Sequence, residues 1–462
     1  MATRTERDSL GTKRIPVDAY YGIQTFRAVE NFPISGLRMP VEFIRAYTFI
    51  KQAAALANAQ LGLLPRRKAR AIVRACEEVL RGKFAAHFVV DVYQAGAGTS
   101  FNMNVNEVLA NRANELLGAR RGTYRFLHPN DHVNMAQSTN DTFPTALRLA
   151  SLMKLGPLTR AMQELEGAFQ RKARQFGGVV KAGRTHLQDA VPVSVGRELG
   201  AYALAIRKSR EHLSQTATRL TELNLGGTAV GTGLNAHPRY RFLAIRSLRR
   251  WTGFALRPGE DLMERTQSLA DFAHLSSALR DYSLELIRIA NDLRLMSSGP
   301  NTGFGELTLP AVQPGSSIMP GKVNPAIPEL VDMVAFQVLG HDATVAMACQ
   351  AGQLELNVMM PVVAYNLLQA MQILTATSHA FATRCVGGMT VNAAQCRSYA
   401  QRSLALVTAL APRIGYAKAA TIAKRSLASG KPIMDLVVEQ GILSAREAQR
   451  LLDPKRLARL SR

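Results

Sequence analysis

The chain has 462 residues, of which 47% are hydrophobic, 20% charged and 6% aromatic, and its formal net charge is +23. This hydrophobic content suffices for a large core, and the length predicts about three domains or one large domain with subdomains. No uninterrupted apolar run is long enough to span a bilayer, and residues 1–8 lack the apolar core of a signal peptide. We therefore expect a soluble, cytoplasmic protein.

The excess of positive charge is distributed over short clusters, at residues 66–68, 120–121, 249–250 and 455–456. Aromatic residues do not alternate with these clusters, so they do not predict a nucleic-acid footprint. A positive field would attract a small dicarboxylate, which affects the rate of capture more than the chemistry. The cysteines are predicted to be buried reduced thiols, because no Cys-x-x-Cys or disulfide spacing joins Cys76, Cys349, Cys385 and Cys396.

Residues 1–137 are predicted to form an N-terminal domain that is mixed but mostly helical. Short helical stretches alternate there with turns rich in Gly and Asn, such as residues 94–100. Residues 138–391 contain longer periodic segments and are predicted to form a central domain. Residues 392–462 predict a small C-terminal helical domain, whose helices are separated by Gly415, Gly430 and Gly441.

The central segments show the apolar periodicity of long, packed helices. The clearest stripe alternates four and three residues apart and consists of Leu275, Leu279, Tyr282, Leu286, Ile289, Leu293 and Met296. This spacing keeps one apolar stripe on a helix that packs lengthwise against others. A second stripe, with one break at Arg210, consists of Leu199, Tyr202, Ile206, Leu213, Ala217 and Leu220.

Three further segments, 146–176, 326–351 and 361–386, have a similar pattern, with Pro157 expected at a kink or an early turn. Several such helices form a bundle. The fold class is therefore mainly α, with a central bundle of long helices. Stripes on more than one face of these helices suggest packing between subunits.

Four separated segments are rich in polar residues that a core would not choose: residues 96–107, 128–144, 183–189 and 314–325. Each alone could be turn and cap chemistry, since Ser138 or Thr139 would suit the opening of a helix. His186 alone would more often be a structural histidine. Four such segments in one chain favour a shared polar cleft.

The segment 314–325 reads Pro-Gly-Ser-Ser-Ile-Met-Pro-Gly-Lys-Val-Asn-Pro. Gly315 and Gly321 can act as hinges on either side of two hydroxyls. Such a loop could close over a small anion, with donors at one end and the charge of Lys322 at the other. The apolar residues Ile318 and Met319 suggest packing in a closed state, although a plain surface loop is the alternative.

These segments resemble those of the aspartase/fumarase superfamily, whose signature Gly-Ser-Ser-x-Met-Pro-x-Lys-x-Asn is found here at residues 315–324. The resemblance extends from the Tyr-Tyr-Gly-Ile-Gln-Thr segment at residues 20–25 to the last helices. It implies a three-domain fold around a helical bundle, a homotetramer whose active sites are each built from three subunits, and elimination of a C–N or C–O bond that usually releases fumarate. No metal or organic cofactor is required by the residues that carry this resemblance.

The resemblance also assigns roles to the polar residues, because the reaction forms an enediolate that needs donors aimed at one carboxylate. Ser316 is the implied base, and His186 the second catalytic residue. The β-carboxylate is assigned to Thr99, Ser138, Thr139 and Ser317. The α-carboxylate is assigned to Lys322 and Asn324, and the amino group to Asn140 and His186, with Thr185 nearby.

Glu329 lies where a family glutamate does and would pair with His186 and set its tautomer. The alternative for Glu329 is an acid in the first turn of a helix after Pro328, where the helix dipole favours it. The sequence leaves both interpretations open.

Within the superfamily the residues favour an aspartate ammonia-lyase, a carbon–nitrogen lyase. Residues 20–22, 91–94, 132–134 and 138–140 resemble those enzymes, whereas residues 104–107 and 128–131 resemble class II fumarases. Met360 stands where aspartases usually have Glu and fumarases Arg, and Asn301 replaces a usual Arg. The rival hypotheses are a class II fumarate hydratase and a catalytically silent, basic paralogue.

Overall fold

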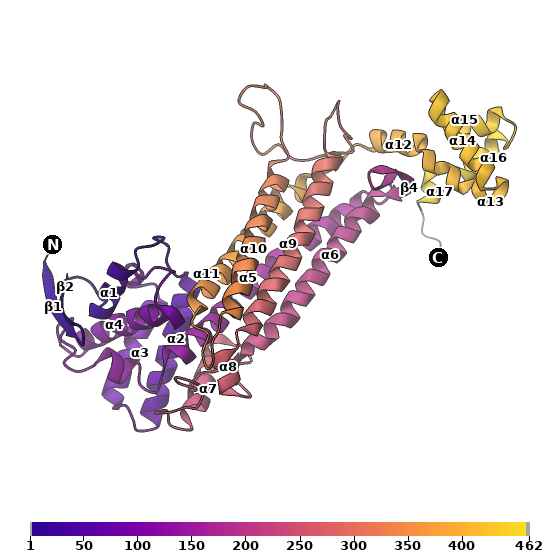
Figure 1. Cartoon of the computed structure of the whole chain (residues 1–462). Coiled ribbons are helices and arrows are strands. Elements are labelled where there is room, and N and C mark those ends of the chain that lie inside the picture. Colours follow the sequence, from indigo (N-terminus) through magenta and orange to yellow (C-terminus); the bar gives the residue numbers. More distant parts are fainter. Residues whose placement is uncertain (1, 459–462) are drawn as a thin grey trace. The chain divides into compact units, whose positions relative to one another are not determined.

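The structure is a computed structural model that describes residues 2–458. It is mainly helical, and the sheets among the described residues are two-stranded (Figure 1). The predicted mainly α class is confirmed. The described chain divides into two compact units: residues 2–159, 211–281 and 336–374 form the first, and residues 160–210, 282–335 and 375–458 form the second.

The three domains predicted along the chain, 1–137, 138–391 and 392–462, are a different division, and they stay a prediction. Residue 1 and residues 459–462, at the ends of the first and third of them, lie outside the described residues.

Five long helices form the bundle: α5 (Thr139–Gln175), α6 (Val195–Ala217), α9 (Ala270–Met296), α10 (Ala326–Gln350) and α11 (Met360–Arg384). The predicted stripe on α9 is confirmed, since Leu275, Tyr282 and Leu293 and its other members are all buried. The stripe on α6 is buried as well. Pro157 lies well inside α5, so the early-turn alternative for it is wrong.

Polar contacts join these helices within each unit. In the first unit, Ser276 of α9 donates a 2.6 Å hydrogen bond to Asp342 of α10. In the second, Tyr282 of α9 and Ser378 of α11 share a hydrogen bond of 2.7 Å. Arg294 of α9 forms a 2.8 Å ion pair with Asp332 of α10. The helices thus pack lengthwise, as the apolar periodicity predicts.

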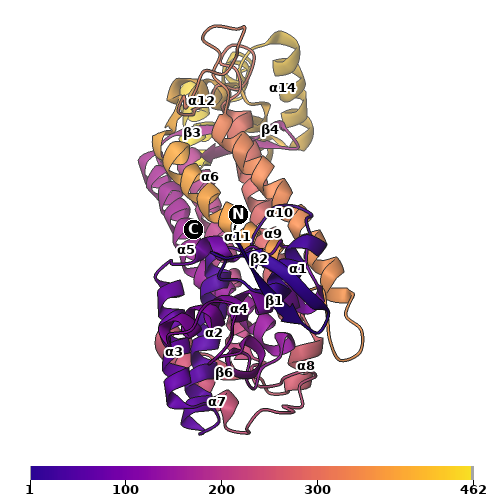
Figure 2. The ribbon, with the colours of Figure 1, turned by 90° about the vertical axis from the view of Figure 1, so that its left-hand side faces the viewer.

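The first unit also contains shorter elements. The strands β1 and β2 form an antiparallel hairpin beside α1 (Figure 2), and α2 packs against α3 and α7. Their bounds are β1 Thr3–Asp8, β2 Gly11–Pro16, α1 Ile23–Asn31, α2 Val41–Gln60, α3 Arg66–Leu80, α4 Thr99–Leu116, β5 Glu222–Leu223, α7 Tyr240–Thr252, β6 Arg257–Pro258 and α8 Leu262–Gln267.

The second unit contains the hairpin β3–β4 and a group of short C-terminal helices with their own apolar core. Gly415 and Gly430 have positive φ at the junctions of these helices, and Gly441 has it after α15, so the predicted separators are confirmed. The bounds are β3 Val180–Thr185, β4 Gln188–Ser194, β7 Leu307–Thr308, β8 Thr390–Val391, α12 Ala393–Arg402, α13 Ala411–Ile414, α14 Tyr416–Ser429, α15 Ile433–Glu439, α16 Ala445–Leu451 and α17 Pro454–Leu457.

The helix α10 carries an exposed apolar stripe. Met333 and Met347 are each 65% exposed, and Phe336 is 59% exposed. Together with Gly340 and Ala343, which are also exposed, they are spaced three and four residues apart. By length and composition alone α10 could cross a membrane, a weak indication because core helices of soluble proteins pass the same test. Four residues with titratable carboxyl or imidazole groups interrupt it: Glu329, Asp332, His341 and Asp342.

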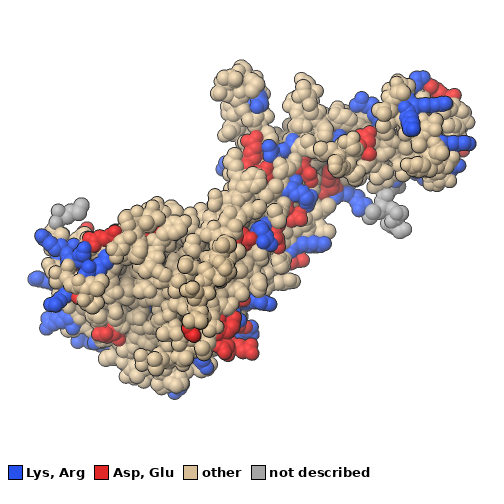
Figure 3. All heavy atoms as spheres, in the orientation of Figure 1, with Lys and Arg blue, Asp and Glu red and all other residues tan. Residues whose placement is uncertain are grey.

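The basic side chains are scattered over the face shown in Figure 3, over the β1–β2 end of the first unit and over the C-terminal helices of the second. Acidic side chains lie between several of them. This distribution agrees with the sequence, in which short basic clusters alternate with other residues.

Candidate active site

The first group of predicted site residues lies in the first unit, where α4 begins beside the start of α5. Gly98 has φ of +85°, and a Cβ atom there would lie 2.0 Å from the ring of Phe143 in α5. Only glycine therefore allows this close approach. Thr99 follows as the first residue of α4 and is exposed, so its hydroxyl lies at the surface near the first turns of α5.

Ser138, Thr139 and Asn140 form the opening turn of α5. Ser138 Oγ accepts a hydrogen bond of 3.1 Å from the Asn140 N–H, so Ser138 also caps the helix, as its residue type predicts. Asn140 Nδ2 donates to the Ala229 carbonyl oxygen at 2.7 Å. This bond fixes the orientation of the amide, and it leaves Asn140 Oδ1 as the atom that can accept from an amine.

The buried side chain of Lys51, in α2, connects the segments around this turn. Its Nζ donates to Asn102 Oδ1 at 2.7 Å, to Asn134 Oδ1 at 3.0 Å and to Gln137 Oε1 at 3.0 Å. All three protons of the ammonium group thus have acceptors. Burial lowers the pKa of Lys51 to about 7, and the negative charge of Asp141 opposes that shift. Lys51 therefore links α4, which begins at Thr99, to the segment that leads into Ser138.

Thr185 and His186 lie at the tip of the β3–β4 hairpin in the second unit. Thr185 pairs with Gln188, so His186 and Leu187 form the two-residue turn, and their φ angles are +51° and +65°. Such turns favour Gly and Asn, and each residue held there at positive φ costs about 1–3 kcal/mol. Backbone strain of this kind concentrates at functional sites. The turn presents the His186 imidazole, which is exposed, away from the hairpin.

Two cations of β3 anchor this hairpin to Glu306. Arg184 Nη1 lies 2.9 Å from Glu306 Oε1, and Lys181 Nζ lies 3.2 Å from Glu306 Oε2. The Arg184 guanidinium also lies 4.1 Å from the ring centroid of Phe304. Glu306 is completely buried, and its pairing with two cations compensates for the loss of hydration. One ion pair thus lies near the base of the hairpin and the other next to its turn, and both fix the hairpin in place.

Residues 297–325 connect α9 to α10. The last part of this connection, the loop at residues 314–325, extends beyond the helix ends (Figure 1). Its base is closed by the Gly315 N–H, which donates to the Lys322 carbonyl oxygen at 2.8 Å. Asn324 Nδ2 donates to the Gly315 carbonyl oxygen at 2.7 Å, and its second amide proton remains for another acceptor. A Cβ atom on Gly315 would lie 2.5 Å from the Lys322 oxygen, so this closure needs glycine.

Ser316 Oγ accepts hydrogen bonds from two backbone N–H groups, those of Ile318 at 3.2 Å and Met319 at 2.9 Å. Donors aimed at an oxygen favour its ionised form. Ser316 thus has the backbone donors that a serine base needs. Ser317 and Lys322, on the same loop, are exposed.

The packing that Ile318 and Met319 suggest for a closed state is not present in this conformation. Ile318 is 84% exposed and Met319 is 49% exposed. The Ile318 side chain is therefore mostly in contact with solvent, and the Met319 side chain is about half exposed to it.

Glu329 lies in the first turn of α10, where its N–H donates to the Pro325 carbonyl oxygen at 3.1 Å. In the described chain no hydrogen bond or ion pair joins Glu329 to His186. The first-turn interpretation of Glu329 thus matches its position in the chain, and its pairing with His186 stays a prediction.

Comparisons with known proteins show the family of this chain. A family model described as "Lyase" matches residues 11–340, and one described as "Fumarase C C-terminus" matches residues 406–459. The chain belongs to the aspartase/fumarase superfamily. Within that superfamily it is 47% identical over 451 residues to an aspartate ammonia-lyase from Bacillus sp, covering 98% of this chain and 96% of the relative. It is 46% identical to the aspartate ammonia-lyase of Escherichia coli strain K12, covering 96% and 94%.

Two solved structures of the superfamily have nearly the same fold. A "fumarate lyase:delta crystallin" from Brucella melitensis, bound to cobalt, has a TM-score of 0.97 and 49% identity, covering 99% of this chain and all of that one. A class II fumarase from Schistosoma mansoni has a TM-score of 0.96 and 37% identity, with 99% of both chains covered. The mainly α fold predicted from the superfamily resemblance is thus confirmed.

The predicted site residues are divided between the two units. The first unit holds Thr99, Ser138, Thr139 and Asn140, and the second holds Thr185, His186, Ser316, Ser317, Lys322, Asn324 and Glu329. Within the first unit, Lys51 links α4, which begins at Thr99, to the segment that leads into Ser138, and Asn140 bonds the Ala229 carbonyl oxygen. The roles of all these residues stay predictions.

The sequence reasoning missed several buried charged residues, among them Lys51, Glu107 and Asp141. Glu107 accepts hydrogen bonds from the N–H groups of Gly22, Gln24 and Thr25 and from the Thr25 hydroxyl, so it ties the N-terminal segment to α4. For Lys51 the sequence offered one signal, a lysine within the apolar run of α2. Asp141 and Glu107 stand inside the polar segments, but their partners lie far away in sequence.

The two departures from the superfamily pattern have different surroundings. Met360 is completely buried as the first residue of α11, and Asn301 is exposed between α9 and the loop. A buried thioether at position 360 places no charge there.

Among residues 2–458 no group of three or more His, Cys, Asp or Glu side chains is arranged to hold a metal ion.

Proposed function

We propose that this protein is an aspartate ammonia-lyase, which reversibly eliminates ammonia from L-aspartate to give fumarate. The observation that carries this proposal is the similarity along nearly the whole chain to several aspartate ammonia-lyases, at 45–48% identity. The class II fumarase structure is 37% identical over a similar length. The chain therefore resembles the ammonia-lyases more closely than that fumarase.

The proposed reaction begins with removal of a proton from the carbon beside the β-carboxylate. Ser316, as its alkoxide, takes this proton, and the two backbone donors at 3.2 and 2.9 Å from Oγ supply part of its activation. The electron pair of the broken C–H bond passes to the β-carboxylate, which becomes an enediolate. Thr99, Ser138, Thr139 and Ser317 donate to this charge.

The second half of the reaction breaks the C–N bond. The enediolate collapses to form the C=C bond of fumarate, and the electron pair of the C–N bond leaves with the nitrogen. Lys322 and Asn324 hold the α-carboxylate. Asn140 Oδ1 accepts from the amino group, and His186 lies beside it.

We also propose that the protein works as a homotetramer with active sites shared between subunits. One observation supports the assembly. The exposed stripe of Met333, Phe336 and Met347 on α10 has the three-and-four spacing of a helix that packs lengthwise against another. A reducing, cytoplasmic location completes the proposal, and the four free cysteines are compatible with it.

The second candidate is a class II fumarate hydratase. It is favoured by residues 104–107 and 128–131, which resemble fumarases, and by the TM-score of 0.96 to the Schistosoma mansoni enzyme. Water or hydroxide, in place of ammonia, would then be the leaving group. Met360 does not discriminate, since it matches neither usual residue.

The experiment that separates these functions is ultraviolet detection of fumarate from the purified protein. L-aspartate is supplied in one cuvette and L-malate in another. Fumarate from L-aspartate alone is the expected result. Fumarate from L-malate alone would replace the ammonia-lyase by the fumarase, and no fumarate from either would favour the catalytically silent, basic paralogue or another amine substrate.

A further inference from the structure

Asp141 lies where the opening turn of α5 meets a glycine-rich segment, residues 224–233. Its completely buried carboxylate accepts three backbone hydrogen bonds. The Ser138 N–H donates to Oδ1 at 3.0 Å, and the N–H groups of Gly226 and Thr228 donate to Oδ2 at 3.0 and 3.1 Å. One oxygen thus holds the turn, and the other holds the glycine-rich segment.

Two asparagines make further connections between the same two segments. Asn224 Nδ2 donates to the Asn140 carbonyl oxygen at 3.1 Å. Asn140 Nδ2 donates to the Ala229 carbonyl oxygen at 2.7 Å. Because Ala229 follows Thr228 directly, the position of its carbonyl depends on the bond between Thr228 and Asp141. The amide orientation of Asn140 therefore depends on Asp141.

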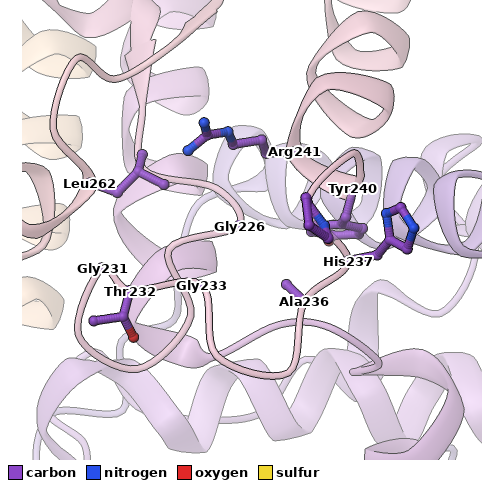
Figure 4. A pocket seen from close by; sticks show the side chains of 10 residues that line it. Gly226, Gly231, Thr232, Gly233, Ala236, His237, Tyr240, Arg241 and Leu262 are labelled. Atoms are coloured by element: carbon purple, nitrogen blue, oxygen red, sulfur yellow. The ribbon is translucent and has the colours of Figure 1, made fainter.

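The glycine-rich segment packs closely on part of its surface, since a Cβ atom on Gly226 would lie 2.7 Å from Arg241 Cβ and one on Gly231 would lie 2.5 Å from the backbone of Met263. It borders a cavity of about 230 Å³, into which Gly226, Thr232 and Gly233 face from the segment and Arg241 from α7 (Figure 4). Thr228 adopts φ of +57°, an unfavourable angle for a β-branched residue. The Gly226 and Thr228 N–H groups, which donate to Asp141, are therefore among the contacts that hold residues 226–229 in this strained conformation.

The surroundings of Asp141 act on its charge in opposite directions. Burial raises the pKa of the carboxyl to about 7, whereas the three N–H donors and the charge of Lys51 favour the ionised form. Lys51 is held in turn by Asn102, Asn134 and Gln137. The buried cation and the buried carboxylate therefore stabilise neighbouring parts of one framework.

We propose that Asp141 is a positioning residue, which holds residues 138–140 against the glycine-rich segment and so aims their hydroxyl and amide groups at the substrate. This inference rests on the proposed function, because that function gives residues 138–140 their role. Asp141 is enclosed and does not touch the substrate. It acts through Ser138 and Thr139 on the β-carboxylate, and through Ala229 and Asn140 on the amino group.

The test is Asp141→Asn, which keeps the size of the side chain but turns an N–H₂ group towards backbone donors. We expect kcat for L-aspartate, expressed per folded protomer, to fall by about 10², in the range found when an enzyme loses one oxyanion donor, and KM to rise. Asp141→Glu should recover part of the loss, because it restores two acceptor oxygens at a shifted position. A purely structural role would lower the amount of folded protein and leave kcat per folded protomer unchanged.

The matched control is Asp342→Asn, which makes the same change at another buried aspartate of the first unit, bound to Ser276 and Arg280. Its kcat should stay within about twofold of the wild type, since its partners Ser276 and Arg280 are not those of Asp141 and sites without shared partners usually behave independently. If Asp141→Asn does not fold, Asn224→Ala removes a second connection without touching the buried charge, and a several-fold loss of kcat is expected.

Hydrogen exchange gives a readout that does not depend on the reaction. Amides of residues 224–229 should exchange at least tenfold faster in Asp141→Asn than in the wild type, and they should be unchanged in Asp342→Asn. Unchanged exchange or unchanged kcat and KM in Asp141→Asn would overturn the positioning role. A wild type that forms no fumarate from L-aspartate would instead refute the proposed function, and the exchange experiment would still test the connection.

Discussion

Ser316 Oγ lies 2.9 Å from the backbone nitrogen of Met319, which donates a hydrogen bond to it. A second donor, the N–H of Ile318, lies 3.2 Å away. A serine hydroxyl is a weak base in water, and donors of this kind stabilise its ionised form. The loop therefore contributes to the chemistry by its backbone as well as by its side chains.

Replacing Ser316 by Ala removes the proposed base, and we expect turnover to fall by about 10² or more, the range of lost acid–base catalysis. The initial rate of fumarate formation from L-aspartate measures this. Ser429→Ala is the matched control, because Ser429 bonds the Arg425 carbonyl in α14, within the C-terminal helices. Near-normal turnover of Ser316→Ala would remove Ser316 as the base.

Lys322 is exposed on the open loop and carries the charge assigned to the α-carboxylate. Lys322→Met should weaken apparent affinity for L-aspartate by about tenfold or more, since a charge-assisted hydrogen bond contributes about 1.5–3 kcal/mol. KM and the inhibition constant of succinate measure the loss. Lys322→Arg should recover part of it, and equal affinity in Lys322→Met and the wild type would reject the assignment.

His186 has φ of +51° in the hairpin turn. Its backbone conformation lowers stability, whereas its imidazole is assigned to catalysis, and one substitution can separate these two effects. His186→Gly should raise the free energy of unfolding by up to about 1 kcal/mol, because glycine adopts positive φ without the steric cost. Turnover should nevertheless fall, because the imidazole is lost. His186→Asn, which also tolerates this φ, is the comparison, and thermal melts with rate measurements test both. A less stable His186→Gly would contradict the strain in this turn.

The long helices could be predicted because their signal is local and periodic. The stripe from Leu275 to Met296 is buried residue by residue, since a helix repeats its face every three to four residues. Pro157 was harder, because packing along the bundle keeps α5 helical through a residue that ordinarily ends or kinks a helix.

The site could be predicted as a set of residue types but not as a geometry. Asp141 contacts Gly226 and Thr228, more than eighty positions away in sequence, and no periodicity reveals such a pair. The turn at His186 and Leu187 contains neither Gly nor Asn, so turn chemistry gave no signal for its positive φ. The two donors to Ser316 are backbone groups, which every sequence provides.

The apolar stripe on α10 predicts an interface between copies of this chain. Met333→Lys together with Met347→Lys would place two charges on it, and we expect a smaller species with little activity, because the burial of each apolar side chain contributes about 1.5–3 kcal/mol. Light scattering coupled to gel filtration measures the mass. Leu427→Lys, at a 73% exposed position in α14, is the control. An unchanged mass in the double variant would exclude this stripe from the interface.

Glu78 and Arg112 form a bidentate ion pair that makes stability depend on pH. Arg112 Nε lies 2.8 Å from Glu78 Oε2, and Arg112 Nη2 lies 2.9 Å from Oε1. The hydrogen bond to Arg112 holds the pKa of the Glu78 carboxyl below its usual value of 4.5. Because the folded-state pKa is depressed, the unfolded chain binds more protons over this range, and stability rises with pH there.

The stabilisation from Glu78 is therefore fully present above about pH 4.5 and is lost as the pH falls through the lower folded-state pKa. Glu78→Gln should reduce the free energy of unfolding at pH 7 by about 1–3 kcal/mol, and the difference from the wild type should shrink towards pH 3. Urea melts of both proteins at pH 7, 5 and 3.5 measure it. Glu439→Gln, whose exposed pair with Lys431 is screened by water, should change little at any of these pH values. A deficit for Glu78→Gln that stayed constant down to the lowest pH would mean that the pair is not ionised in the folded protein.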